Sequence, residues 1–181
     1  YAIEQNLDHL YLFRDLGVRV MQLTYNTQNL VGSGCWESRD SGLSDYGREV
    51  IDCMNDLGIL VDLSHVGDQT SRDAIAHSQK PVAYTHCFPA ALKEHPRNKS
   101  DDMLKLLADK GGFVGIVAYT PFMPKGDAST VEDVLDGYEH VIGLIGEDRV
   151  GIGTDFTQGQ GVEFFESLRS DKGFGRPLAE P

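Results

Sequence analysis

A mostly apolar segment that leads into a histidine constrains the fold of this chain more than any other feature. Residues 59–63 form the segment, and His65 follows it closely. A run that is apolar on both faces is typical of a parallel strand covered on both sides. Two other strand-like segments end in the same manner, one in His86 and one in Asp155. We therefore expect three strands of one sheet to carry a metal-ligand type of side chain at their C-terminal ends.

Strand-like and helix-like segments alternate along the rest of the chain. The patterns predict helices at residues 3–16, 43–57, 68–78, 100–111 and 130–142, and strands at residues 18–24, 59–63, 81–86, 113–119 and 149–155. Regular alternation of this kind indicates a parallel sheet, either open or closed as a barrel. No Gly-x-Gly-x-x-Gly motif links a strand to a helix, which argues against a dinucleotide-binding fold.

Chemically active side chains at several strand ends favour the barrel, because barrel enzymes place their sites at that face. A complete (β/α)8 barrel needs eight strands and about 250 residues, whereas this chain has 181 residues and five predicted strands. We therefore expect an α/β fold that is a partial (β/α)8 TIM barrel with about five of the eight strand–helix units. The tail at residues 157–181 has no clear pattern and is expected to be irregular.

Composition excludes some classes of function. The formal net charge of −12 argues against a nucleic-acid partner, which requires clustered Lys and Arg. No apolar run is long enough for a membrane span, and no signal-peptide pattern opens the chain. The absence of an initiator Met suggests a piece of a longer protein. We expect a soluble chain, with the compartment open between cytoplasm and periplasm and a homodimer open as an oligomeric state.

The three strand ends suggest metal chemistry. Two neutral imidazoles, His65 and His86, together with the Asp155 carboxylate suit Zn²⁺ and similar divalent ions. A metal of this kind lowers the pKa of bound water to about 7 and so supplies a nucleophile for hydrolysis. Side-chain alternation would place Gly151 and Gly153 on the face of Asp155, leaving room beneath the site. The plainer alternative for either histidine is a hydrogen-bonded residue of the core.

Other polar residues have competing interpretations. Asp62 has the opposite parity to His65 and is expected to brace nearby backbone. His95 is expected to face solvent, although an approach to substrate remains open, and Arg97 could hold a substrate carboxylate or anchor its loop through an ion pair. Cys87 follows a predicted ligand, but a small buried residue is the favoured interpretation. The remaining histidines, on predicted helices, are expected at the surface: His9, His77 and His140.

Several motifs together resemble the membrane (renal-type) dipeptidase family, which consists of zinc-dependent dipeptidases. The motifs are Asp62-Leu-Ser-His65, Tyr84-Thr-His86, Arg97-Asn98 and Gly151-Ile-Gly-Thr-Asp-Phe156, and Leu23-Thr-Tyr-Asn-Thr-Gln-Asn29 with Gly42-Leu-Ser44 is similar to the bacterial branch. The resemblance covers nearly the whole chain. It implies a (β/α)8 barrel with a two-zinc site that hydrolyses dipeptides, and residues 1–181 as a single incomplete metallo-dependent hydrolase domain.

The resemblance also implies roles for individual residues. His65 and His86 would bind one zinc, and Arg97 would hold the C-terminal carboxylate of the dipeptide. Asp155 would lie over the metals, contact the substrate amine and assist proton transfer. Tyr25 stands where animal members carry a histidine that contacts the substrate carbonyl, and its hydroxyl can still donate a hydrogen bond.

Parts of the family pattern are absent from this chain. The family's first-strand His-x-Asp motif and its zinc-bridging carboxylate are not found, and Glu4 lies in the predicted first helix. We therefore expect a fragment that lacks N-terminal and C-terminal parts and is not a competent enzyme by itself. Two alternatives remain open: another metal-dependent barrel hydrolase acting on amides or lactones, and a non-catalytic barrel remnant that binds a partner.

Overall fold

Five parallel strands form a single sheet in the computed structural model, which describes residues 2–161 and 163. The strands are β1 (Val20–Gln22), β2 (Leu60–Asp62), β3 (Ala83–Cys87), β4 (Phe113–Ile116) and β5 (Val150–Ile152). Each strand pairs in parallel with the next in chain order. The prediction of an α/β fold with alternating strands and helices, as in part of a (β/α)8 barrel, is confirmed.

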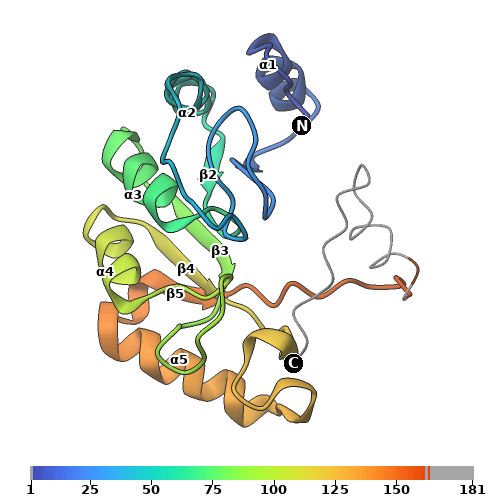
Figure 1. The fold of residues 1–181 in the computed structure, drawn as a ribbon, viewed down its shortest axis with the longest axis vertical. Helices are drawn as coiled ribbons and strands as arrows, with labels where there is room; N and C mark the ends of the chain where they lie inside the picture. The colour runs from blue at the N-terminus through green and yellow to red at the C-terminus, as the bar shows by residue number, and fades with distance from the viewer. Residues whose placement is uncertain (1, 162, 164–181) are drawn as a thin grey trace.

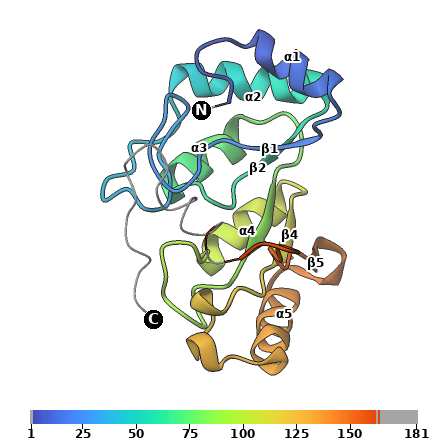
Figure 2. The same ribbon diagram turned by 90° about the vertical axis from the view of Figure 1, so that its right-hand side faces the viewer.

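The helices follow one another along one side of this sheet (Figure 1). They are α1 (Asp8–Asp15), α2 (Asp45–Leu57), α3 (Asp68–His77), α4 (Asp101–Asp109) and α5 (Val131–Ile145), with short 3₁₀ turns η1 (Thr120–Phe122), η2 (Gly126–Ala128) and η3 (Glu147–Arg149). Each α-helix packs against the next. Both views place α1 and α2 at one end of the molecule and α5 at the other (Figures 1 and 2). Because all strands run in parallel, their C-terminal ends meet at one edge of the sheet.

Local capping explains where the helices begin and end. Ser44 accepts a hydrogen bond from the Gly47 backbone nitrogen at 2.9 Å, so α2 begins at Asp45, two residues later than predicted. The same helix ends at Gly58, whose left-handed backbone (φ 66°) suits glycine. The first helix begins at Asp8, well after the predicted residue 3. Glu4 has a positive φ of 47°, which is incompatible with a right-handed helix.

Apolar side chains fill the space between the helices and the sheet. The fully buried members include Leu10, Ile51, Met54, Leu63, Leu104, Leu107 and Ile116. The fifth strand has no space beneath it, contrary to the prediction from its glycines. A Cβ at Gly151 would meet the Phe113 ring, and one at Gly153 would collide with the Thr85 carbonyl oxygen. These glycines therefore permit close packing of neighbouring segments and do not open a cavity.

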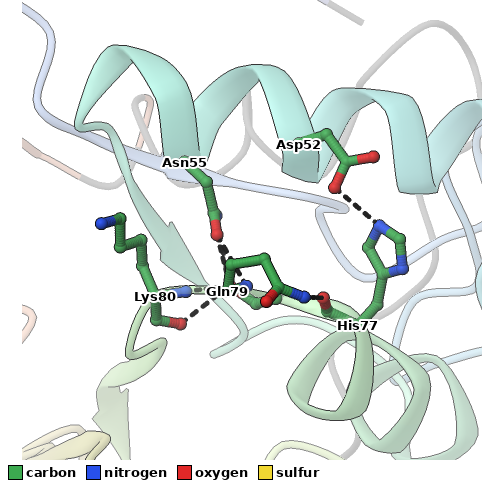
Figure 3. A network of polar contacts seen from close by, with 6 residues as sticks. Asp52, Asn55, His77, Gln79 and Lys80 are labelled. Carbon is green, nitrogen blue, oxygen red and sulfur yellow. Dashed lines mark hydrogen bonds and ion pairs between the residues drawn. The ribbon is translucent and has the colours of Figure 1, made fainter.

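Polar contacts link α2 to α3 and to the segment just after α3 (Figure 3). The Asn55 side-chain oxygen on α2 accepts a hydrogen bond from the Gln79 backbone nitrogen, just beyond α3, at 2.8 Å. His77 at the end of α3 lies 2.9 Å from the Asp52 carboxylate, measured from Nε2 to Oδ1. No helix in the described part of the chain is both long and apolar enough to cross a membrane.

Candidate active site

The predicted site residues lie at the C-terminal edge of the sheet, but only one of the three strand-end residues lies within a strand. His86 belongs to β3, whereas His65 and Asp155 each lie three positions beyond the last residue of their strands. The side-chain alternation predicted for His65 and Asp155 is therefore wrong, because alternation stops where the extended backbone stops. Turns after β2 and β5 aim these two side chains instead. Asp155 adopts a left-handed backbone with φ 61°.

The two imidazoles converge. His65 Nε2 lies 3.0 Å from His86 Nε2, and the ring centroids are 5.0 Å apart. His65 is only 7% exposed. Burial lowers the pKa of both rings, and the positive charge of Arg97 lowers it further. Both histidines are therefore neutral at pH 7, which is the form that binds a metal ion.

The Nδ1 atom of each ring, on the side away from the other histidine, contacts an oxygen atom. His65 Nδ1 lies 2.7 Å from the Asn26 side-chain oxygen, and His86 Nδ1 lies 2.8 Å from the Thr85 hydroxyl. Asp62 braces nearby backbone, as expected, because its carboxylate accepts hydrogen bonds from the Ser64 and Thr85 nitrogens. Sequence reasoning missed Asn26 and Thr85. Both residues lie within the motifs that carry the family resemblance, and Thr85 directly precedes His86.

Arg97 is 2% exposed and lies beside the two histidines. Its guanidinium donates to the Ser64 and His86 carbonyl oxygens, and Nη2 lies 3.3 Å from His65 Nε2. Its buried Nε has no hydrogen-bond partner among the described residues. Lys99, also fully buried, donates to the Val66 carbonyl oxygen at 2.7 Å and was missed by sequence reasoning. No described carboxylate forms an ion pair with either cation.

Tyr25 and Asp155 form the exposed border of the site. Tyr25 is 50% exposed, and its ring stacks on His65 with centroids 4.2 Å apart. Burial of the hydroxyl is the main cause that raises the pKa of Tyr25, and the Asp155 carboxylate adds to it. Asp155 also raises the pKa of His86, although burial and Arg97 outweigh this effect. The carboxylate is thus close enough to interact electrostatically with the other site residues.

Aromatic side chains line the loop that carries Arg97. The His95 ring lies edge-on to Trp36 and packs on Phe122, with centroids 5.5 and 4.8 Å away. His95 is half-buried, so it is less open to solvent than expected, since segments distant in sequence cover part of the ring. Partial burial, with help from Lys93 and Arg97, lowers the pKa of His95 to about 4. The guanidinium of Arg97 lies over the same Phe122 ring at 5.2 Å.

The remaining candidates have structural roles. Cys87 is buried, and burial raises its thiol pKa to about 12, so the interpretation as a plain core residue is confirmed. The helix histidines His9, His77 and His140 are half-buried, somewhat less open than expected. His140 lies 2.8 Å from the Asp101 carboxylate, in the same manner as His77 beside Asp52.

The described residues fit part of a metal site. Two zinc-bound nitrogens 2.0–2.1 Å from the ion at a tetrahedral angle lie roughly 3.3 Å apart, close to the 3.0 Å between the histidine Nε2 atoms. Within the described ranges, no group of three or more His, Cys, Asp or Glu side chains is arranged to hold a metal ion. The spacing of His65 and His86 would thus suit two nitrogen ligands of one metal ion, and further ligands would come from elsewhere.

Relatives of known sequence carry the name dipeptidase. This chain is 38% identical over 162 residues to an uncharacterized dipeptidase of Schizosaccharomyces pombe, covering 86% of this chain and 39% of the relative. It is also 38% identical over 143 residues to dipeptidase verJ of Clonostachys rogersoniana, covering 78% and 37%. The chain therefore spans less than half the length of these relatives.

Solved structures share the fold over most of the chain. A crystal structure of an amidohydrolase from Pseudomonas aeruginosa superposes with a TM-score of 0.94 at 54% identity, covering 99% of this chain and 55% of that one. A metallopeptidase from Rhodobacter sphaeroides, liganded with a phosphinate mimic of the dipeptide L-Ala-D-Ala, gives a TM-score of 0.77 at 28% identity, covering 96% and 55%.

A family model extends these similarities to most of the sequence. The model describes the membrane dipeptidases, peptidase family M19, and it matches residues 1–170. The match includes every residue of the candidate site. The family is one of metallopeptidases, so a metal cofactor is implied. This chain belongs to the membrane dipeptidase family, peptidase family M19.

Proposed function

We propose that the full-length protein is a zinc-dependent dipeptidase and that His65 and His86 hold one of its two zinc ions. The observation that carries this proposal is the convergence of two neutral imidazoles, 3.0 Å apart, beside a buried guanidinium without an acidic partner among the described residues. When bound, zinc would activate a water molecule for attack on the peptide carbonyl. The dipeptidase names of the relatives support the same reaction.

Arg97 is proposed to bind the C-terminal carboxylate of the dipeptide. A fully buried cation without a charge partner is costly, and an arriving carboxylate would relieve that cost. The Nε donor of Arg97, buried and without a described partner, is available for such a ligand. A planar guanidinium can also bind a carboxylate with two parallel hydrogen bonds, which fixes the orientation of the substrate.

Asp155 and Tyr25 are proposed to act on the other end of the substrate and on its carbonyl. Asp155 is exposed at the border of the site, where its carboxylate can bind the substrate amine and accept a proton. Tyr25, held by stacking on His65, can donate its hydroxyl proton in a hydrogen bond to the oxygen that gains charge during attack.

A second candidate function is hydrolysis of other amides. The structural relative with 54% identity is named an amidohydrolase, which does not specify dipeptides. A substrate panel separates the two candidates: dipeptides, N-acyl amino acids, simple amides and lactones are offered to the full-length protein. Hydrolysis restricted to dipeptides supports the first candidate, preference for N-acyl amino acids or simple amides supports the second, and preference for lactones contradicts both.

We further propose that residues 1–181 form a single incomplete domain that is not competent by itself. Among the described residues, no strand pairs with the outer edge of β1 or β5, and these residues supply only two imidazoles toward a two-zinc site. The purified 181-residue chain is therefore expected to show no zinc-dependent cleavage of dipeptides. Cleavage by that chain would contradict this part of the proposal.

The direct test measures metal and activity together in the full-length protein. Chelation should abolish hydrolysis of dipeptides, and added Zn²⁺ should restore it in proportion to bound metal. A full-length protein that binds no zinc would instead favour a non-catalytic barrel that binds a partner. Retained activity after complete removal of metal would contradict the proposal outright.

A further inference from the structure

Each imidazole of the candidate metal site contacts an oxygen atom through Nδ1. For His65 this oxygen is the side-chain amide oxygen of Asn26, at 2.7 Å. An amide oxygen has no proton to donate, so it can only accept. The Cys35 thiol also donates to this oxygen, at 3.6 Å. His65 therefore carries its proton on Nδ1.

The oxygen that contacts His86 is a hydroxyl, whose direction is decided by its other partners. Thr85 Oγ1 lies 2.7 Å from Asp62 Oδ2 and 2.8 Å from His86 Nδ1. The hydroxyl has one proton, and a carboxylate can only accept it. Thr85 therefore donates to Asp62, and its oxygen accepts the Nδ1 proton of His86.

The Asp62 carboxylate is itself held in place from several sides. Its Oδ1 accepts hydrogen bonds from the Ser64 nitrogen at 3.0 Å, the Ser64 hydroxyl at 2.6 Å and the Thr85 nitrogen at 3.2 Å. The side chain is 2% exposed. A buried carboxylate that accepts this many hydrogen bonds is held in a fixed position, so the direction of the Thr85 hydroxyl is fixed as well.

Both histidines are thus left with an unprotonated Nε2, and these two atoms face each other at 3.0 Å. Two lone pairs at this separation repel unless a cation lies near them. Arg97 Nη2 donates a hydrogen bond to His65 Nε2 at 3.3 Å and so brings positive charge to this position. The arrangement is therefore prepared for a metal ion and is unfavourable for a simple hydrogen bond between the rings.

We infer that Asn26 and the Thr85–Asp62 pair are positioning residues, which fix His65 and His86 as the Nδ1–H tautomer with Nε2 directed at one shared metal ion. The inference rests on the proposed function for the identity of the ligand, but the tautomers can be measured without metal. The two supports differ: a neutral amide holds His65, whereas a hydroxyl polarised by a buried carboxylate holds His86.

The test uses matched pairs of variants in the full-length protein. Asn26→Gly removes the amide and suits the left-handed backbone at this position (φ 63°). Asn26→Asp retains an acceptor and tolerates the same backbone. Thr85→Val removes the hydroxyl with little change in shape, and Thr85→Ser retains it. Asn55→Ala is the control, since it removes an amide that bridges α2 and the end of α3, away from the site.

The first readout is the side-chain ¹⁵N spectrum of metal-free, histidine-labelled protein at neutral pH. The wild type should show protonated Nδ1 and bare Nε2 for both residues. Asn26→Gly should mix the tautomers of His65 alone, and Thr85→Val those of His86 alone, while Asn26→Asp, Thr85→Ser and Asn55→Ala keep the wild-type pattern. Protonated Nε2 in the wild type, or unchanged tautomers in both disruptive variants, would overturn the inference.

The second readout is zinc affinity, measured by competition with a chromophoric chelator. Asn26→Gly and Thr85→Val should each weaken zinc binding by about 10- to 100-fold, the usual effect of removing a partner of a ligating histidine. Asn26→Asp and Thr85→Ser should restore most of it. If the wild type shows the expected tautomers but binds no zinc, the proposed function fails while the tautomer assignment stands.

Discussion

His65 and His86 meet ring to ring at the edge of the sheet, whereas His77 and His140 each meet a carboxylate on the outer helices. The rings of the first pair are neutral and contact Asn26, Thr85 and Arg97; His65 is buried and His86 is half-buried. Each of the other two has an exposed or half-exposed acid at 2.8–2.9 Å (Figure 3 shows His77 with Asp52).

The difference teaches how a ligand site is separated from a surface ion pair. A histidine beside an acid already has the partner that its protonated form requires, and the pair contributes little in water. Two neutral rings that present nitrogens to each other lack such a partner and gain one when a cation binds. To recognise a candidate metal-binding histidine, the partner of each ring nitrogen is therefore a better guide than the burial of the residue.

The largest expected effect is on activity. His65→Ala or His86→Ala should lower kcat/KM for dipeptides by about 1,000-fold or more, equivalent to about 4 kcal/mol of transition-state stabilisation. The matched controls His77→Ala and His140→Ala should change it by less than about twofold, with losses of stability near 0.5 kcal/mol. Steady-state kinetics and urea unfolding measure both. If the control variants lowered kcat/KM as much as His65→Ala and His86→Ala do, the proposed distinction between the two pairs of histidines would be wrong.

Arg97, which forms no ion pair with an acid among the described residues, gives the next test of this comparison. Arg97→Lys retains the charge but loses two-point binding, so KM for a dipeptide should rise about 100-fold, while kcat changes less. A dipeptide with an amidated C-terminus lacks the carboxylate and should be a poor substrate for both proteins. Unaltered discrimination between the free and amidated substrates in the variant would show that Arg97 does not bind the carboxylate.

Tyr25 should give a smaller effect. Tyr25→Phe preserves the stacked ring on His65 and removes only the hydroxyl, so kcat should fall roughly 10-fold, or about 1.4 kcal/mol. Thermal unfolding should be nearly unchanged, because the residue is half-exposed. A fall in stability without a fall in kcat would assign Tyr25 to packing alone.

The smallest expected effect is a change in the pH dependence of stability, and it concerns His95, which packs against aromatic rings and belongs to neither pair. The folded-state pKa of His95 is about 4, below its ordinary value of 6.5. The unfolded chain thus binds more protons between these pH values, so stability rises with pH through this range and is lost as pH falls. The His95→Asn variant retains a hydrogen-bond acceptor for the backbone nitrogen of Arg97 and removes the imidazole that titrates.

The urea midpoint of the His95→Asn variant should therefore vary less between pH 4.5 and 7 than that of the wild type. Expressed as a free energy of unfolding, the difference in pH dependence between the two proteins should be about 1 kcal/mol. This is well below the value obtained by converting the whole pKa shift, because water screens a partly exposed ring. A midpoint with the same pH dependence in both proteins would show that packing of His95 against Trp36 and Phe122 does not restrict its protonation.

Much of this architecture was predictable because it follows from local pattern. Apolar periodicity located the five strands, and a parallel sheet necessarily brings their C-terminal ends to one edge. The meeting of His65 and His86 follows from that rule. The cover over His95 and the acceptor Asn26 were not predictable in this way, because both depend on a loop returning from a distant part of the sequence.

The amino-acid sequence by itself determined the order of the elements, the pairing of strands as neighbours and the choice of His65 and His86, since these depend on periodicity and residue type. Only the tertiary structure decided how the rings are oriented, which atoms hold them, and that the glycines of residues 151–153 close space instead of opening it. Periodicity describes positions along one segment, whereas hydrogen bonds and steric contacts at the site join segments far apart in the sequence, such as Thr24 and His65, which are 41 residues apart.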